Sequence, residues 1–394
     1  MSRLEELIAE LCPDGVEYKA LCEFGTMIRG NGLQKKDFTD SGVGCIHYGQ
    51  IYTYYGAFAY ETKSFVSPDL AKQLKKVNTG DLVIAITSEN VEDVCKCVAW
   101  LGNEEIVTGG HSAIFKHDQN AKYLSYYFQT EAFFSQKRKI ANGTKVIEVS
   151  PQKLERAIIP LPPLPVQREI VRILDNFTEL TAELTAELTA ELTARKKQYE
   201  YYRDLLLSFD DNPRVKWMTL GEVCSMKAGK AISSTDISDT QNDDFPYPCF
   251  GGNGLRGYVK TYNQIREAPL IGRQGALCGN VCFADGEYFA TEHAVVVTPG
   301  EHFNVRFSYY LLIFMNLNQF KTAGAQPGLS VAKLERIIVP IPPLEEQQRI
   351  VAILDRFDAL CNDLTSGLPA EIEARRKQYE YYRDKLLTFK EATA

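Results

Sequence analysis

Polar and basic side chains gather on glycine-containing turns in two separate parts of this chain. In residues 1–153 they are Lys35, Lys36, His47, Gln50, Ser88, Asn90 and Lys145. In residues 213–333 they are Asn253, Arg256, Arg273, Gln274 and Gln326. Arginine, lysine, asparagine and glutamine are the residue types that form paired hydrogen bonds with base edges in the DNA major groove. These residues are candidate DNA contacts, although polar residues also occur on the turns of any protein surface.

The sequence motifs of common catalytic sites are absent. No G-x-x-x-x-G-K-[ST] segment is present, which argues against a P-loop ATPase. Neither H-E-x-x-H nor G-x-S-x-G occurs, and Gly30-Asn31-Gly32 is only a fragment of a dinucleotide-binding fingerprint. The pairs Cys95/Cys97 and Cys278/Cys282 lack the second pair that a zinc ribbon needs. We therefore expect a chain that is not an enzyme, with no catalytic residues, no metal and no cofactor of its own.

Short strands and turns are expected to position the candidate side chains. Runs such as DLVIAITSE in the first part and APLIGRQGA in the second, bounded by glycine and asparagine, are typical of strand-and-turn structure. The segment Gly-Gly-His111-Ser-Ala-Ile also resembles Thr-Glu-His293-Ala-Val-Val. We expect two divergent copies of one α/β domain, in which the two histidines form structural hydrogen bonds rather than act in catalysis.

A long block that follows each of these parts occurs twice. Residues 154–209 and 334–389 align without a gap at an offset of 180, and about 34 of the 56 aligned residues are identical. Each copy opens with prolines, which favour extended backbone, and then turns helical. Pro165 lies near the first helical position of one copy, whereas Glu345 and Glu346 lie in the first turn of the other. Both choices suit the start of a helix.

Apolar residues recur at helical spacing after each start, and they form matching stripes in the two copies. The first stripe is Ile170, Ile173, Leu174, Phe177, Leu180, Leu184 and Leu188, and the second is Ile350, Ile353, Leu354, Phe357, Leu360 and Leu364. No glycine or proline interrupts the first helix, which would span roughly 65 Å at 1.5 Å per residue. Gly367 and Pro369 predict a kink in the second helix.

The predicted fold class is α+β, in which two α/β domains are separated by two long antiparallel α-helices that form a coiled coil with a pseudo-two-fold internal repeat. The expected segments are residues 1–153, 154–212, 213–333 and 334–394.

Three tandem TAEL units lie at Thr181–Leu192 in the first helix. Each unit adds about 6 Å and about 40° of rotation beyond a full turn, so a gain or loss of one unit would move whatever the helix carries by a fixed step. A repeat without any role is the alternative.

Size and charge restrict the possible functions. With 394 residues the chain can hold two or three domains. A net charge of −7 argues against strong DNA binding by the chain alone, so we expect a partner to supply positive charge. No run of 18 apolar residues and no secretory signal are apparent, and the ten cysteines are scattered. These features predict a cytoplasmic protein with reduced thiols and no membrane contact.

The paired LER…IIP and RKKQYEYYRD blocks resemble the specificity subunit of type I restriction–modification systems. The TAEL run is similar to the spacer of the type IC branch, and the Gly-Gly-Asn-Gly, Gly-Arg-Gln-Gly-Ala and Thr-Glu-His-Ala-Val-Val runs are similar to one class of target recognition domain. The resemblance covers essentially the whole chain, although the first recognition domain (residues 1–153) matches only in outline. Residues 213–333 would form the second recognition domain.

The resemblance implies double-stranded DNA as a ligand, with each recognition domain binding one half of a bipartite site. It also implies two modification (methyltransferase) subunits, which carry S-adenosylmethionine, and restriction (translocase/nuclease) subunits as partners. The main alternative is a DNA-independent coiled-coil scaffold that carries two lectin-like or peptide-binding domains. For the RKKQYEYYRD blocks, packing of the tyrosines within the coiled coil is favoured over contact with a partner.

Overall fold

The computed structural model describes residues 2–209, 212–275, 277–322, 327–363 and 366–392. The chain forms two compact units, one of residues 1–186 with 373–394 and the other of residues 187–372. Each unit therefore combines one recognition domain with parts of both helical repeats, so the units cut across the four segments expected from the sequence.

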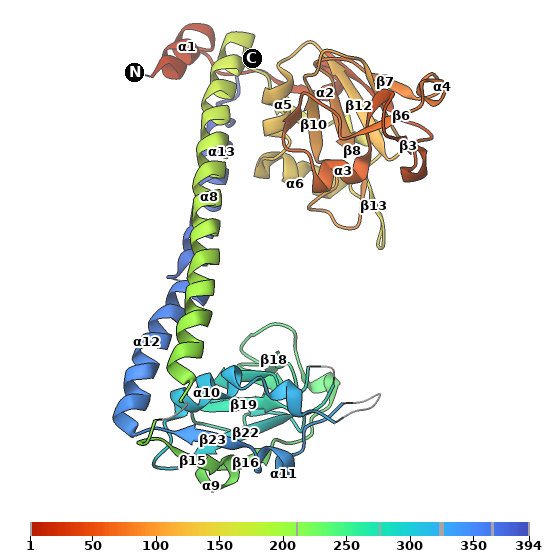
Figure 1. The fold of residues 1–394 in the computed structure, drawn as a ribbon. Coiled ribbons are helices and arrows are strands. Elements are labelled where there is room, and N and C mark those ends of the chain that lie inside the picture. The colour runs from red at the N-terminus through yellow and green to blue at the C-terminus, as the bar shows by residue number, and fades with distance from the viewer. Residues whose placement is uncertain (1, 210–211, 276, 323–326, 364–365, 393–394) are drawn as a thin grey trace. The chain divides into compact units, whose positions relative to one another are not determined.

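Two five-stranded sheets form the recognition domain of the first unit (Figure 1). One sheet has the order β2 (Gly25–Arg29), β12 (Ser112–His117), β8 (Leu82–Ala85), β10 (Cys97–Trp100) and β5 (Phe58–Ala59). The other has the order β3 (Phe38–Thr39), β6 (Ser64–Val66), β4 (Val43–Ile46), β11 (Ile106–Thr108) and β7 (Lys75–Val77). Strands β8 and β10 are buried on both faces, which explains their continuous apolar sequences.

Smaller elements complete the first unit. The pairs are β1 (Tyr18–Ala20) with β14 (Ile158–Pro160) and β9 (Thr87–Ser88) with β13 (Ile147–Glu148). The short helices are α1 (Arg3–Leu11), α2 (Leu21–Phe24), η1 (Lys35–Asp37), α3 (Tyr48–Thr53), α4 (Pro68–Ala71), α5 (Ala121–Tyr127), α6 (Glu131–Ile140) and α7 (Pro151–Leu154).

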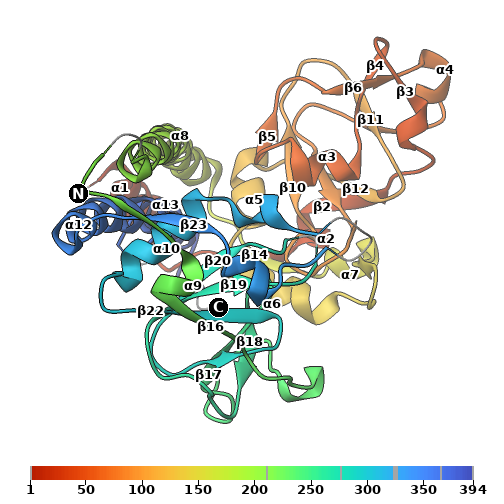
Figure 2. The same ribbon diagram turned by 60° about the horizontal axis from the view of Figure 1, so that its bottom comes forward.

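The recognition domain of the second unit has a four-stranded and a three-stranded sheet (Figure 2). The larger has the order β16 (Cys224–Ala228), β22 (Ala294–Pro299), β19 (Ala268–Gly272) and β20 (Val281–Ala284), and the smaller β18 (Gly254–Val259), β17 (Tyr247–Gly251) and β21 (Phe289–Ala290). Strand β15 (Lys216–Thr219) pairs with β23 (Ile338–Ile341). The short helices are α9 (Leu220–Val223), η2 (Ser234–Asp236), α10 (Val305–Phe314), η3 (Leu317–Phe320) and α11 (Val331–Leu334).

The two recognition domains share one sheet core. In both, an edge strand (β2 or β16) pairs with the strand that directly follows His111 or His293 (β12 or β22). That strand pairs in turn with a central apolar strand (β8 or β19). Strands β10 and β20 extend the sheet in the same way, and β1–β14 corresponds to β15–β23. The expectation of two divergent copies of one domain is therefore confirmed.

The helical repeats form one continuous helix and one broken helix, as the sequence predicts. Helix α8 runs from Leu164 to Leu207 over 44 residues, whereas the second copy forms α12 (Leu344–Asn362) and α13 (Leu368–Leu386). Gly367 lies at the break, and a Cβ atom there would come within 2.6 Å of the Ala359 carbonyl oxygen. No helix among the described residues is long and apolar enough to span a membrane.

Equivalent aromatic pairs join the antiparallel helices within each unit. In the first unit the ring of Phe177 on α8 stacks on Tyr382 of α13, with centroids 6.0 Å apart. In the second unit Phe357 of α12 stacks in the same way on Tyr202 of α8, at 5.7 Å. The two pairs are related by the offset of 180 residues. Not every stripe residue is buried, however, because Leu180 is 61% exposed.

The TAEL leucines are only half-buried for a geometric reason. Leu184 and Leu188 are four residues apart, so each successive leucine is turned by about 40° around the helix. A coiled-coil seam needs an average spacing of 3.5 residues to remain against its partner. Packing along this part of α8 is therefore shallow.

Each recognition domain is joined to its own repeat helix by one carboxylate. In the first unit Asp175 on α8 accepts hydrogen bonds from Lys122 Nζ and the Tyr126 hydroxyl of α5, both at 2.8 Å. In the second unit Asp355 on α12 accepts from Arg306 Nη2 at 2.8 Å and the Tyr310 hydroxyl at 2.5 Å, both on α10. We call these two clusters the Asp175 joint and the Asp355 joint.

A fully buried glutamine adds to each joint. Gln167 accepts from the Asn120 backbone N–H and donates to the Pro162 carbonyl. Gln347 accepts from the Asn304 N–H and donates to the Pro342 carbonyl. Buried backbone groups need such partners, so the glutamines fix how the domain meets the start of its helix.

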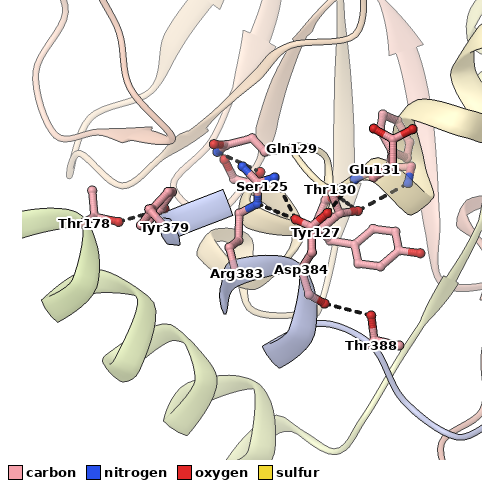
Figure 3. A network of polar contacts seen from close by, with 11 residues as sticks. Ser125, Tyr127, Gln129, Thr130, Glu131, Thr178, Tyr379, Arg383, Asp384 and Thr388 are labelled. Carbon is pink, nitrogen blue, oxygen red and sulfur yellow. Dashed lines mark hydrogen bonds and ion pairs between the residues drawn. The ribbon is translucent and has the colours of Figure 1, made fainter. Parts of the chain in front are cut away.

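The second of the paired blocks, RRKQYEYYRD at residues 375–384, packs against the recognition domain of its unit as well as against α8 (Figure 3). The carboxylate of Asp384 accepts from the Glu131 backbone N–H at 2.9 Å, at the start of α6. The hydroxyls of Tyr379 and Thr178 lie 3.0 Å apart, which links α13 to α8. Coiled-coil packing thus accounts for Tyr379, while the neighbouring Tyr381 remains 62% exposed.

Candidate nucleic-acid interface

The second recognition domain contains a hollow of about 600 Å³ at the end of its central strand β19. The turn that joins β17 to β18 forms one wall, and the residues that follow β19 form another. Three of the candidate DNA contacts, Asn253, Arg256 and Gln274, line this hollow together with His293. The structure therefore brings together residues that are up to 40 positions apart in the sequence.

Glycines allow the turn to approach the strand so closely. A Cβ atom at Gly272 would lie 1.8 Å from the Gly252 carbonyl oxygen, so no other residue fits at the end of β19 without movement of the turn. Gly254 has a φ of +92°, a conformation that residues with a side chain rarely adopt. The Gly-Gly-Asn-Gly run is thus required by the shape of the hollow.

Buried polar atoms without partners lie beside this hollow. The atoms are Arg273 Nε, Glu292 Oε2 and His293 Nδ1, and none has a hydrogen-bond partner among the described residues. The other carboxylate oxygen of Glu292 lies 3.2 Å from His293 Nε2. Buried polar atoms are nearly always paired in folded proteins, so an unpaired group of this kind indicates uncommitted hydrogen-bonding capacity.

The first recognition domain has a smaller cleft of about 320 Å³ at the corresponding place. Its lining includes the candidates Ser88 and Asn90, together with Tyr48, Tyr52, Thr87, Glu89, Asp93, His111 and Val146. The Tyr48 ring lies 4.8 Å from the His111 ring, and Thr87 Oγ1 is 3.0 Å from His111 Nδ1. This cleft is therefore more aromatic, and neither arginine nor lysine is among the residues that line it.

Hydrogen bonds show that the two clefts are equivalent. The backbone N–H after the central strand donates to the histidine carbonyl in both domains, from Ile86 to His111 and from Arg273 to His293, at 2.9 Å each. Ile86 and Arg273 thus occupy the same position, and so do the two histidines. The His111 imidazole contacts Thr87 and the His293 imidazole contacts Glu292, and both side chains line the clefts, which the sequence analysis did not propose.

Two candidates in the first domain serve as helix caps. His47 Nδ1 accepts from the Gly49 N–H at the start of α3, and Gln50 Oε1 accepts from the His47 N–H. The Gln50 amide also donates to the Ser64 hydroxyl at 2.6 Å. Burial and the charge of Lys35 lower the pKa of His47. Because these side chains are occupied within the domain, we do not include them in the proposed interface.

Neither cleft is lined by the candidates Lys35, Lys36, Lys145 and Arg273. Lys35 and Lys36 are exposed on η1, and Lys145 is exposed on the loop before β13. Gln326 lies outside the described residues. Tyr48 and Tyr52 were missed, although their position in the glycine-bounded run GCIHYGQIYTYYG could have indicated them.

Loop anchoring in the first domain depends on a buried lysine. Lys137 of α6 donates to the carbonyls of Glu92 and Val94, at 2.7 and 2.8 Å, and so holds the loop that carries Asn90. Burial lowers the pKa of Lys137. Within the described part of the chain no group of three or more histidine, cysteine or acidic side chains is placed to hold a metal ion.

Comparisons with known proteins agree with this architecture. The family model described as the type I restriction modification DNA specificity domain matches residues 13–194 and 214–374. The EcoprrI type I restriction enzyme specificity subunit of Escherichia coli is 48% identical over 252 residues. That alignment spans 62% of this chain and 62% of the relative.

Two further proteins resemble the chain over a larger share of its length. A putative type I restriction enzyme specificity subunit of Haemophilus influenzae is 35% identical over 74% of this chain and 76% of its own. A solved chain from work on complex assembly and conformational transition of the type I R-M system has a TM-score of 0.68 at 18% identity, with 96% of this chain and 98% of that chain covered. With the family model matched in both halves, the chain belongs to the type I restriction–modification DNA specificity family.

Proposed function

We propose that this chain is the sequence-specific DNA-binding subunit of a type I restriction–modification complex, and that each recognition domain binds one half of a bipartite DNA site. The observation that carries the proposal is the duplicated cleft, formed at the same place in two domains and lined by polar residues. A site that comes in two halves needs two such surfaces. The chain itself performs no catalytic step.

The partners supply the chemistry and much of the phosphate-binding charge. A chain with a net charge of −7 repels DNA overall, whereas affinity for DNA depends mainly on neutralised phosphates. Modification subunits would bind S-adenosylmethionine and methylate adenine, and restriction subunits would join the same complex. DNA binding is therefore expected to require the modification subunits.

Repeated exposed apolar residues support two copies of the modification subunit. Tyr201 and Tyr381 are 65% and 62% exposed, and Ile158 and Ile338 are exposed in the same way. The two members of each pair are separated by 180 residues, so the same exposed apolar residues occur in both repeats. Exposed apolar patches of this kind often mark protein–protein contacts. A single kind of partner could therefore bind at both places.

Co-purification and methylome sequencing together test the proposed function. The chain is expressed with and without the type I modification subunit of its host, and DNA binding and methylation are measured. We expect a stable complex, binding that depends on the partner, and methylation at one bipartite motif. A chain that captures no methyltransferase and leaves the genome unmethylated would favour the DNA-independent scaffold.

The TAEL run is proposed to set the gap between the half-sites, as in a type IC-like spacer. One unit rotates the helix by about 40°, close to the twist of one base pair when a turn holds about 10 to 10.5 pairs. Deletion of residues 185–188 should shorten the tolerated gap by about one base pair and leave both half-sites unchanged. Mapping of methylated sites checks this, and an unaltered gap length would refute it.

A further inference from the structure

Beside the cleft of the second recognition domain lies an arginine in an unusual state, Arg273, which directly precedes the lining residue Gln274. Arg273 is half-buried, and its side chain forms no hydrogen bond or ion pair with any described residue. Every other arginine described in the second unit either is exposed or pairs with a carboxylate. A partly buried cation without a partner is costly to the folded protein unless a ligand pairs with it.

A carboxylate with free capacity lies on the strand end that faces Arg273. The Arg273 N–H donates to the His293 carbonyl, so Arg273 and His293 are cross-strand neighbours, and Glu292 precedes His293. The Glu292 carboxylate bonds His293 through one oxygen, while its other oxygen has no partner in the described structure. The two facing strand ends thus offer guanidinium donors on one and a carboxylate acceptor on the other, with His293 bonded to that carboxylate.

The equivalent positions in the first domain have a different chemistry. Ile86, which is fully buried, takes the place of Arg273, and Gly110 takes the place of Glu292. The first domain therefore folds with the same strand ends and without a charged pair. It follows that the shared sheet does not require charged residues at the positions of Arg273 and Glu292.

We propose that Arg273 and Glu292 recognise a G·C base pair in the half-site that the second domain binds. Arg273 donates to the O6 and N7 atoms of guanine, and Glu292 accepts from the N4 amino group of cytosine. These are the contacts that the two side-chain types form in the major groove. The inference rests on the proposed function, and it adds a base identity at one position of one half-site.

The test uses the assembled complex with its modification subunits. Methylated sites are first mapped for the wild-type chain, then for Arg273→Ala, Arg273→Lys and the control Arg266→Ala, an exposed arginine of the same unit. We expect a G·C pair in one half-site, relaxation to other bases at that position in both Arg273 variants, and an unchanged motif in the control. Lysine should not rescue the specificity, because it keeps the charge but loses the two-point fork.

Modified DNA provides a second readout that does not depend on methylation. Replacement of the guanine by 7-deazaguanine removes only the N7 acceptor, so the wild-type complex should lose affinity. The loss would be between about 5- and 150-fold if this change abolishes the whole bidentate contact. The Arg273→Ala complex should show no further loss on this DNA.

Three outcomes overturn the inference: no G·C pair in either half-site, an unchanged motif in both Arg273 variants, or equal sensitivity of Arg273→Ala and wild type to 7-deazaguanine. Each of these leaves the proposed function in place, provided that the wild-type complex methylates a bipartite motif. Absence of any bipartite motif would instead overturn the proposed function. Thermal unfolding and co-assembly of each variant show that the fold is retained.

Discussion

The two halves of this chain keep the same joints but have different clefts. The Asp175 joint and the Asp355 joint use a basic residue, a tyrosine and an aspartate at corresponding places. The clefts share a backbone frame, yet one is lined by two tyrosines and the other by Arg256, Asn253 and Gln274. A duplicated protein can therefore retain its means of assembly while it changes what each half binds.

Burial explains why the two halves have kept the same joints while their clefts have changed. Gln167 and Gln347 are fully enclosed and satisfy backbone groups that no other side chain reaches, so a change there leaves buried polar groups unpaired. Side chains of the clefts lie on loops, where substitutions alter recognition with little cost to the fold. The comparison leads to three predictions, from the largest effect to the smallest.

Loss of the buried glutamines should have the largest effect, a decrease in the free energy of unfolding. Gln347→Leu removes the partners of the Asn304 N–H and of the Pro342 carbonyl, and Gln167→Leu does the same to Asn120 and Pro162. With two or more unpaired groups at about 1–3 kcal/mol each, we expect a loss of about 3 kcal/mol in either variant. Urea unfolding of the isolated chain measures it.

The matched control is Gln152→Leu, because Gln152 is exposed on α7 and its side chain forms no hydrogen bond with the described residues. Its effect should stay within about 0.5 kcal/mol. If Gln167→Leu and Gln347→Leu differed by more than about 2 kcal/mol, the two joints would not be equivalent.

Removal of the joint charges should lower stability by an intermediate amount. The loss should be confined to the recognition domain that the altered joint holds. Asp175→Asn weakens the contacts to α5 and Asp355→Asn those to α10, at about 1–2 kcal/mol each, since hydrogen bonds to charged groups are the stronger kind. Hydrogen exchange should rise in α5 for the first variant and in α10 for the second.

The control for these variants is Asp69→Asn, whose pair with Lys72 is exposed and worth little. Faster exchange in both domains from a single joint variant would contradict the independence of the two joints.

Removal of exposed lysines of the first domain should have the smallest effect, and that effect should be on the salt dependence of DNA binding. Lys145→Ala and Lys35→Ala each remove one possible phosphate contact, so the slope of log affinity against log salt should fall by about 1, with no change of motif. Binding of the assembled complex at several salt concentrations measures the slope. Lys72→Ala is the control, and a slope that is identical in all four complexes would exclude these lysines from the interface.

Much of the fold and part of the site could be predicted from local sequence. The start of α8 at the prolines, the break near Gly367 and the relation between the two domains all follow from residues that act within a few positions of each other. Asn253, Arg256 and Gln274 were singled out because glycine turns present these side chains, but the hollow that they line was not predicted. The capping role of His47 and Gln50 was not, since only the folded turn shows that both side chains are occupied.

The amino-acid sequence by itself determined the duplication, the long helix and the set of polar residues on turns, because periodicity and backbone preference are local properties. The tertiary structure decided which of those residues meet. Lys122 and Asp175 are 53 positions apart, and Arg306 and Asp355 are 49 apart, yet they form the joints. The correspondence of Arg273 with Ile86 likewise appears only when strands distant in sequence pair, because hydrogen bonds between strands, and not local preference, fix the register.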